Sequence, residues 1–300
     1  MLEIEIAGIK FKNPIMPASG TFGYGTELKN LVDISKLGAV VTKGISLVEK
    51  PGNPGPRIFE TSSGMLNSIG LQNIGFERFV NFTLPKLKNA DTNIIVNFFG
   101  DNEAEYFELS EKLSAYEQIA ALEANISCPN IQKGGIHLGK KPKSVESLVR
   151  NIVKRSKKPV FVKITPDVTS IAEIALACEQ GGASAIVCAN TLSGTAIDIE
   201  KRQFYFKNKF AGLSGPAIKP IALKNVYLVS KSVKIPVIGV GGIRDYKDVI
   251  EFLLVGASAC QIGTENLTNP QCMPEIISNL NNYLENNKIN SLNRLIGKIQ

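Results

Sequence analysis

The sequence has 300 residues, of which 44% are hydrophobic and 20% are charged, and its formal net charge is +7. This composition is typical of soluble proteins and provides enough apolar material for a core. No apolar run approaches the ~18 residues of a membrane span. We expect no secretory signal, because the first residues lack its basic and apolar segments. The lysines are spread along the chain without interleaved aromatic residues, which argues against a nucleic-acid interface.

Residues 3–12 alternate apolar and polar side chains around Ala7-Gly8, which predicts a small β-hairpin at one end of the main body. Short apolar runs then recur along the chain, and the spacing between them leaves room for helices. The eight runs lie at 15–18, 39–42, 94–97, 122–125, 160–163, 185–188, 237–240 and 259–262. Amphipathic segments typical of helices lie between them, at 103–116, 145–156, 171–180, 217–232 and 246–255.

Alternating strands and helices imply parallel strands joined by helical crossovers. Eight such units predict an α/β fold, a (β/α)₈ TIM barrel with an N-terminal β-hairpin; a doubly wound sheet is the alternative. Two connections, 44–93 and 191–215, are too long for simple loops. Because both leave the carboxyl ends of strands, we expect long βα insertions at the C-terminal face, where barrel enzymes place their chemistry. No linker or repeat occurs, so residues 1–300 are interpreted as a single domain.

Polar side chains lie at the same end of most of these runs. They are Ser19, Lys43, Asn97, Asn125, Lys163, Asn190 and Thr191. Surface exposure explains any one of them, but several amides and lysines that converge on one barrel mouth indicate a binding site. Groups of this kind suit a flat, nitrogen-rich ring with carbonyl oxygens, which is the shape of a flavin or a pyrimidine.

Glycines follow the last two runs, at 239–243 and at Gly263, and a third group lies at 212–216. Glycine lets backbone N–H groups approach an anion closely, and barrel enzymes often bind phosphate with the loops after strands seven and eight. A tight turn is the alternative for each loop, but together they predict a phosphate-bearing cofactor. No G-x-G-x-x-G fingerprint opens a helix, which argues against NAD binding by this chain alone.

The segment Asn125-Ile126-Ser127-Cys128-Pro129-Asn130 follows the fourth run and must turn at Pro129. A thiol between two carboxamides at a strand mouth is a candidate base or nucleophile. The alternative is a small buried hydrophobe, which is common for free cysteines. Because the five cysteines are scattered and form no C-x-x-C pair, we expect reduced thiols in a cytoplasm and no metal site on this chain.

Many motifs of this sequence occur in the same order in one known family. Over nearly its whole length, the chain resembles the class 1 dihydroorotate dehydrogenases. The motifs are 13–23, Thr42-Lys43-Gly44, 52–57, 64–73, 125–130, Asn190-Thr191, 212–220 and the two glycine loops. The segment 65–73, and Cys128-Pro129-Asn130 followed by Gly134-Gly135, are similar to the class 1B form. The fold that this resemblance implies is the barrel already expected.

The resemblance implies oxidation of (S)-dihydroorotate to orotate in pyrimidine (UMP) biosynthesis, with FMN on this chain. It also implies a homodimer within a heterotetramer, in which a second subunit carries FAD and a [2Fe–2S] cluster and passes electrons to NAD⁺. The fumarate-dependent class 1A form is one alternative, and Cys128 argues against the membrane-associated class 2 enzymes, which use serine. Two other hypotheses remain: a flavin barrel that reduces another pyrimidine, as in dihydropyrimidine dehydrogenase or dihydrouridine synthase, and a non-catalytic binding barrel.

The resemblance also implies roles for individual residues. Cys128 is similar to the family's base, which removes the C5 proton of dihydroorotate while hydride passes from C6 to FMN N5. The implied substrate positions are Lys43, Asn67, Ser68, Ile69, Gly70, Leu71, Asn125, Asn130, Asn190 and Thr191. The implied FMN positions are Ser19, Lys43, Gly44, Asn97, Asn125, Lys163, Ala189, Gly215, Gly241, Gly242, Gly263 and Thr264.

Three further features are interpreted separately, and the family pattern assigns no role to the first of them, His137. His137, the only histidine, follows Gly134-Gly135 and is interpreted as a residue of the loop over the site. Phe98 and Phe99 are bulkier than the residues expected after Asn97, so they either narrow the pocket or pack under the next helix. The other four cysteines are expected in the core.

Overall fold

The computed structural model describes the backbone of residues 1–127, 132–133 and 136–300, and the side chains of residues 1–127 and 139–300. Eight parallel strands form its central sheet, and each coincides with one of the eight apolar runs. In sheet order they are β3 (Ile15–Pro17), β18 (Ala259–Ile262), β17 (Val237–Val240), β12 (Ala185–Cys188), β11 (Val160–Lys163), β8 (Ile119–Asn125), β7 (Asn93–Phe98) and β4 (Ala39–Val41). The predicted barrel is therefore confirmed, and the doubly wound sheet is not.

The barrel closes between β3 and β4, the two outermost strands of the sheet order. The backbone N–H of Gly38, just before β4, donates to the carbonyl of Ile15 in β3 over 2.9 Å. The chains approach so closely that a Cβ atom at Gly38 would lie 2.1 Å from the carbonyl oxygen of Asn13. Only glycine fits this contact.

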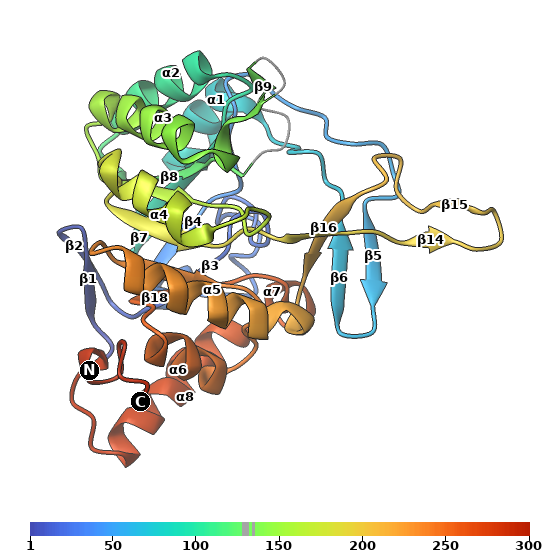
Figure 1. Ribbon diagram of the computed structural model, residues 1–300. Helices are drawn as coiled ribbons and strands as arrows, with labels where there is room; N and C mark the ends of the chain where they lie inside the picture. Colours follow the sequence, from blue (N-terminus) through green and yellow to red (C-terminus); the bar gives the residue numbers. More distant parts are fainter. Residues whose placement is uncertain (128–131, 134–135) are drawn as a thin grey trace.

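Helices surround the strands and bury one face each against them (Figure 1). The longer ones are α2 (Glu103–Ser114), α3 (Pro142–Arg155), α4 (Ile171–Gln180), α5 (Lys219–Ser232), α6 (Tyr246–Leu254) and α8 (Cys272–Asn286). The short ones are α1 (Gly75–Arg78) and α7 (Glu265–Thr268), a π-helical turn at Phe79–Thr83, and 3₁₀ turns at Ile34–Lys36, Leu84–Leu87, Leu138–Lys140, Pro216–Ile218 and Leu292–Arg294. None of the described helices is long and apolar enough to cross a membrane.

Local sequence explains where these helices begin. The side chain of Asn102 accepts from the backbone N–H of Glu105 at the start of α2, and Asp245 forms a capping box with Asp248 at the start of α6. Helix α3 begins three residues earlier than its apolar pattern predicts, because Pro142 is preorganised for the first helical turn. Helix α5 begins two residues later than predicted, because a 3₁₀ turn occupies Pro216–Ile218.

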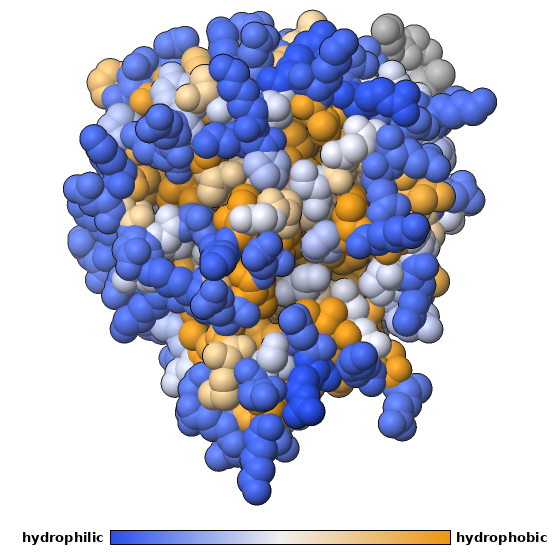
Figure 2. All heavy atoms as spheres, turned by 90° about the vertical axis from the view of Figure 1, so that its left-hand side faces the viewer, coloured by the Kyte–Doolittle hydropathy of each residue, from blue (hydrophilic) through white to orange (hydrophobic). Residues whose placement is uncertain are grey.

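The predicted N-terminal hairpin consists of β1 (Ile4–Ile6) and β2 (Ile9–Phe11), joined by Ala7 and Gly8, both with positive φ. Its inward side chains Ile6 and Phe11 are fully buried. The side chain of Asn93, the first residue of β7, donates to the carbonyl of Lys10, so the hairpin covers the amino end of the barrel. Figure 2 views the molecule from this side, where hydrophilic side chains surround apolar ones gathered toward the middle.

The two long connections meet at the opposite end of the barrel and form a second, antiparallel sheet (Figure 1). Its strands, in sheet order, are β13 (Leu192–Gly194), β16 (Ala211–Ser214), β6 (Gly64–Asn67) and β5 (Ile58–Thr61). A hairpin of β14 (Ile197–Asp198) and β15 (Gln203–Phe204) extends from it, and β9 (Gln132–Lys133) pairs with β10 (Ile136–His137). The sequence predicted the two insertions but not the sheet that joins them, which we call the roof sheet.

Candidate active site

A cavity of about 1110 Å³ lies between the carboxyl ends of the barrel strands and the roof sheet. All eight barrel strands contribute a residue to its wall, either at the strand end or just after it. These residues are Ser19, Lys43, Asn97, Asn125, Lys163, Asn190, Gly241 and Gly263. Met65, Asn67, Gly212 and Ser214 of the roof sheet line the other side. The volume suffices for more than one small ligand.

The three glycine segments converge on one part of this cavity. A Cβ atom at Gly242 would lie 2.9 Å from the carbonyl oxygen of Gly215, and the hydroxyls of Thr264 and Ser214 are hydrogen-bonded at 2.9 Å. Gly215, Gly241 and Gly242 all have positive φ, which glycine adopts without strain. Loops distant in sequence thus bring backbone groups together, as an anion site requires.

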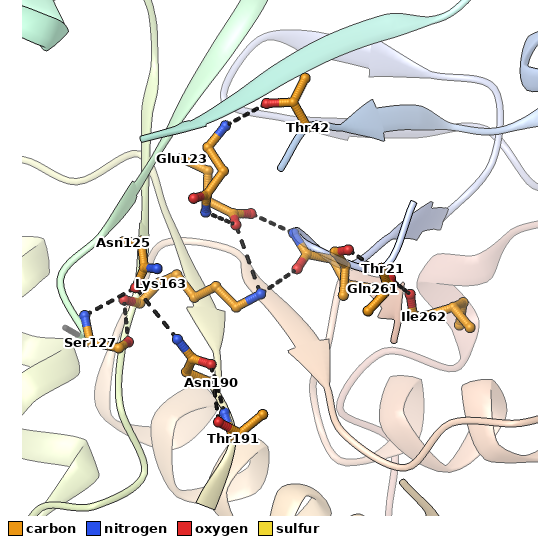
Figure 3. Close-up of polar contacts among 12 residues, drawn as sticks. Thr21, Thr42, Glu123, Asn125, Ser127, Lys163, Asn190, Thr191, Gln261 and Ile262 are labelled. Carbon is orange, nitrogen blue, oxygen red and sulfur yellow. Dashed lines mark hydrogen bonds and ion pairs between the residues drawn. The ribbon is translucent and has the colours of Figure 1, made fainter. Parts of the chain in front are cut away.

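A buried polar cluster lies at the floor of the cavity, inside the barrel (Figure 3). Glu123 of β8 and Gln261 of β18 are fully buried, and Lys163 of β11 is 5% exposed. The side-chain amide of Gln261 donates to Glu123, and the Lys163 ammonium donates to Gln261 Oε1 over 3.2 Å. Lys163 Nζ lies 3.9 Å from Glu123 Oε1. Burial lowers the pKa of Lys163, and the negative charge of Glu123 opposes that shift.

Asn97 connects this cluster to the cavity. Its Nδ2 donates to Glu123 Oε1 over 2.7 Å, and its backbone N–H donates to the hydroxyl of Thr42. Its Oδ1 is buried and has no hydrogen-bond partner among the described residues. A Cβ atom at Gly44 would lie 2.8 Å from that oxygen, so glycine keeps the space beside it open. A buried acceptor without a partner indicates a place for a ligand N–H or O–H group.

A second set of amides lies along the side of the cavity (Figure 3). Asn125 Oδ1 accepts from the backbone N–H of Ser127 over 3.1 Å and from Asn190 Nδ2 over 3.5 Å. Asn190 Oδ1 in turn accepts from the backbone N–H of Thr191. Tyr106 of α2 donates to the carbonyl of Asn125 over 2.6 Å, which fixes the strand end. These bonds orient the amides before any ligand arrives.

The loop that follows β6 is held by its own hydrogen bonds. Asn53 Nδ2 donates to the carbonyl and the hydroxyl of Ser68, and Arg57 donates to three carbonyl or amide oxygens of the neighbouring loops. Gly70 and Leu71 both have positive φ, and a Cβ atom at Gly70 would lie 2.4 Å from the Asn53 backbone nitrogen. The segment from Ser68 to Leu71 therefore presents its backbone to the cavity in one fixed shape.

Lys43 is the second cation in the wall, half-buried after β4. Burial lowers the pKa of its ammonium, and the positive charge of Arg57 lowers it further, while Glu27 acts in the opposite sense. A cation whose burial costs free energy is well placed to meet an anionic ligand.

The structure brings the predicted site residues together. Every predicted position with a described side chain lines this one cavity; besides those of the eight strands, they are Gly44, Asn67, Ser68, Ile69, Gly70, Leu71, Ala189, Thr191, Gly215, Gly242 and Thr264. Cys128 and Asn130 lie outside the described residues, as does the side chain of His137. The roles of all these residues are not tested by their positions and remain predictions.

Two residues of the floor were missed by the sequence reasoning. Glu123 and Gln261 each stand within an apolar run, where a polar side chain needs a buried partner. Both runs contain this signal, although neither shows which residue is the partner.

The sequence left two roles open for Phe98 and Phe99, and each residue has one of them. Phe98 packs against Tyr106 of α2, and Phe99 lines the cavity beside Gly44. Cys178, Cys188, Cys260 and Cys272 are buried, as predicted.

Comparison with known proteins agrees with this geometry. A sequence model of the family described as "Dihydroorotate dehydrogenase" matches residues 1–284. A protein of Geobacter metallireducens named "Dihydroorotate dehydrogenase B (NAD(+)), catalytic subunit" is 50% identical over 299 residues, which cover 100% of this chain and 98% of that protein. A protein of Caldicellulosiruptor saccharolyticus with the same name is 49% identical, with 99% of each chain covered. This chain therefore belongs to the dihydroorotate dehydrogenase family, as its motifs predict.

Proposed function

We propose that this chain, residues 1–300 folded as one domain, oxidises (S)-dihydroorotate to orotate with FMN, as the catalytic subunit of an NAD-linked enzyme of pyrimidine biosynthesis. The observation that carries the proposal is that the Lys163 ammonium and the Asn97 amide both approach Glu123 Oε1 at the cavity, while Asn97 Oδ1 has no hydrogen-bond partner among the described residues. A cation and a buried acceptor held by one carboxylate in one cavity suit an electron-poor ring that carries an N–H group. The names of the relatives support the same substrate and acceptor for this chain.

The residues present fit FMN. Asn97 Oδ1 offers an acceptor to a ring N–H, Gly44 leaves room beside it, and Lys163 offers a positive charge. Gly215, Gly241, Gly242, Gly263 and Thr264 would hold the phosphate, and Ser19, Lys43, Asn125 and Ala189 the remainder of the cofactor. Bound FMN supplies hydride acceptance, which no protein side chain provides. Lys163 would favour the charge that this acceptance creates.

The substrate is a flat ring with amide groups and a carboxylate. Amides that accept and donate in fixed directions suit its ring, so we propose that Asn67, Asn125, Asn130, Asn190 and Thr191 bind it. Backbone groups from Ser68 to Leu71, through Ile69 and Gly70, would complete the contacts from the side of the roof sheet. Lys43 would pair with negative charge on the ligands, which offsets the free-energy cost of burying its ammonium.

Cys128 is the proposed base that removes the C5 proton of dihydroorotate. A thiol acts as a base near neutral pH only when its pKa lies close to that pH, and it must then pass the proton on, for instance to water. The amides of Asn125 and Asn130 flank it in the sequence and would hold the substrate against it.

Onward electron transfer is assigned to a partner subunit. The names of the relatives specify a catalytic subunit and NAD⁺, which supports a second chain. We propose, from the motif resemblance, that this second chain carries FAD and a [2Fe–2S] cluster in a heterotetramer built on a homodimer of this chain. The four described cysteines are free thiols, which supports a cytoplasmic location for the assembly.

Anaerobic mixing of the flavin-loaded protein with dihydroorotate tests the proposal directly. We expect the flavin absorbance at about 450 nm to bleach and orotate to form in equal amount. Addition of fumarate should not restore the colour, whereas the partner subunit with NAD⁺ should. A flavin that stays oxidised with dihydroorotate would contradict the proposed substrate and favour a flavin barrel acting on another pyrimidine.

A further inference from the structure

The carboxylate of Glu123 is enclosed inside the barrel and surrounded by donors. It accepts from Asn97 Nδ2 on one oxygen and from Gln261 Nε2 on the other, and Lys163 Nζ lies 3.9 Å away. Its side chain is fully buried and does not line the cavity. Glu123 therefore has no direct contact with a ligand, and any effect it has on the site passes through these neighbours.

An ionised carboxylate accepts hydrogen bonds and donates none, so it decides how its two amide neighbours are turned. Gln261 must point its Nε2 at Glu123, which leaves its Oε1 free to accept from Lys163 over 3.2 Å. Asn97 must point its Nδ2 at Glu123, which leaves its Oδ1 on the side of Gly44 and the cavity. The direction of every hydrogen bond in the cluster thus follows from one negative charge.

We propose that Glu123 is a positioning residue. It fixes the amide of Asn97 with its oxygen toward the cofactor, and it keeps the ammonium of Lys163 in the same buried cluster. The inference rests on the proposed binding of FMN. An oxidised flavin ring carries a single N–H, at N3, among several acceptor atoms. Asn97 Oδ1 recognises that N–H, and an Asn97 turned the other way would offer a donor instead.

Replacement of Glu123 by glutamine keeps the shape but cannot keep both bonds, because an amide has one donor end and one acceptor end. If the introduced amide turned its oxygen to Asn97, Gln261 would have to reverse and set its NH₂ group against the Lys163 ammonium. If the introduced amide turned its nitrogen to Asn97, Asn97 would reverse and present NH₂ to the cavity. The first arrangement sets two buried donors, one of them charged, against each other, so we expect E123Q to adopt the second. Either arrangement also leaves Lys163 without its buried counter-charge.

A matched double variant restores the original directions. In E123Q/Q261E the carboxylate stands at position 261, where it accepts from Lys163 and from the side-chain amide nitrogen at position 123. The amide oxygen at position 123 then accepts from Asn97 Nδ2, so Asn97 again turns its Oδ1 to the cavity. The double variant has the same side-chain volumes and net charge as wild type, and only the position of the charge differs.

The experiment uses the full-length apoprotein and FMN labelled with ¹⁵N at N3. We measure the dissociation constant of FMN and the exchange rate of the N3–H proton with water by NMR. One lost buried hydrogen bond of this kind predicts that E123Q binds FMN on the order of 10- to 100-fold more weakly and exchanges N3–H at least about 10-fold faster. E123Q/Q261E should return both values to within about threefold of wild type.

Several results would overturn the inference. One is an N3–H proton that is as protected in E123Q as in wild type. Another is a folded double variant that restores neither the FMN dissociation constant nor the N3–H exchange rate. A third is an N3–H proton that exchanges freely in wild type although FMN is bound. N97A provides a second route should E123Q fail to fold, because it removes the acceptor and leaves Glu123 in place; unchanged N3–H protection in N97A also overturns the inference. A wild-type protein that binds no FMN would instead overturn the proposed function.

Discussion

The backbone N–H of Gly38 donates to the carbonyl of Ile15 over 2.9 Å, and this bond closes the barrel between its first and second strands. A Cβ atom at position 38 would lie 2.1 Å from the carbonyl oxygen of Asn13, and backbone cannot move aside cheaply. We therefore expect Gly38→Ala to lower the free energy of unfolding by about 2–4 kcal/mol, measured by urea denaturation.

Gly55→Ala is the matched control, because a Cβ atom there meets nothing within 4 Å. It should change the urea midpoint little. Equal urea midpoints for Gly38→Ala and wild type would show that the contact between β3 and β4 can be disturbed without loss of stability, contrary to this argument.

Burial lowers the pKa of Lys43 below its ordinary value of 10.5, and Arg57 adds to the shift. The unfolded chain binds the proton more tightly, so the charged lysine costs stability at neutral pH, and that cost disappears as the pH rises through the lowered pKa toward 10.5. We expect Lys43→Met to stabilise the apoprotein at pH 7, with a gain that shrinks above the lowered pKa. The same variant should lose dihydroorotate oxidation, because the cation serves the ligands.

The measurement is the urea midpoint of the apoprotein from pH 7 to pH 10.5, beside the rate of flavin reduction. Lys10→Met removes an exposed lysine and should leave both unchanged. A Lys43→Met protein that is less stable than wild type at pH 7 would contradict the sign of this argument.

Cys128 is expected to matter for proton removal and not for holding the cofactor. Cys128→Ala should retain FMN, yet its flavin should be reduced by dihydroorotate on the order of 10²- to 10⁴-fold more slowly, which is the usual contribution of a general base. Stopped-flow absorbance under anaerobic conditions gives the rate. Cys178→Ala, in α4, serves as the control and should leave the rate at the wild-type level. Reduction of the Cys128→Ala flavin at the wild-type rate would refute the assignment.

The thiols differ in their expected reactivity. Burial raises the pKa of Cys272 to about 12 and also raises those of Cys178, Cys188 and Cys260, so these four stay protonated at pH 8. Iodoacetamide at pH 8 should therefore modify Cys128 first, in step with loss of flavin reduction. Peptide mass spectrometry identifies the modified residue, and orotate should slow the modification. Modification of Cys272 at a similar rate would contradict this order.

The roof sheet has a small core of its own, formed by Leu66, Ala196, Phe206 and Ala211. Phe206 is 1% exposed there, and its loss should cost about 3–5 kcal/mol, mostly within this sheet. We expect Phe206→Ala to raise the KM for dihydroorotate while FMN stays bound, because Asn67 belongs to the same sheet. Steady-state assays with a dye acceptor, and hydrogen exchange of β6 and β16, report the two effects.

Phe252→Ala is the contrasting variant, since Phe252 is a fully buried residue of α6 in the main core. It should lower global stability and leave the KM near the wild-type value. A Phe206→Ala protein with an unchanged KM would show that the core of the roof sheet does not contribute to substrate binding.

The barrel was predictable because each strand is a short apolar run between turn residues, and runs of this kind are typical of buried parallel strands. The roof sheet was not, because β6 and β16 are four residues each, and β16 is partly glycine and serine. Their pairing depends on tertiary contact between distant segments, which a local pattern does not contain.

The residues of the site also fall into those that the sequence predicted and those that it did not. Motifs identified Asn97 and Lys163, and both lie in the cavity wall. Glu123 was not identified, because its partner Gln261 lies 138 residues further along the chain and no spacing rule connects them. The side chain on which the chemistry is proposed to depend, Cys128, lies outside the described residues, so its role stays a prediction.

The pairing of β6 with β16 also bears on the order in which the molecule is made. Asn67 Nδ2 donates to the carbonyl of Gly212, 145 residues later in the chain, so the roof of the cavity cannot form until that later strand has left the ribosome. The β5–β6 hairpin must wait with an unpaired edge while four of the eight barrel strands, β7, β8, β11 and β12, are synthesised. Because Gly263 and Thr264 complete the wall of the same cavity, ligands can stabilise only a nearly complete chain, which couples cofactor and substrate capture to the last stage of folding.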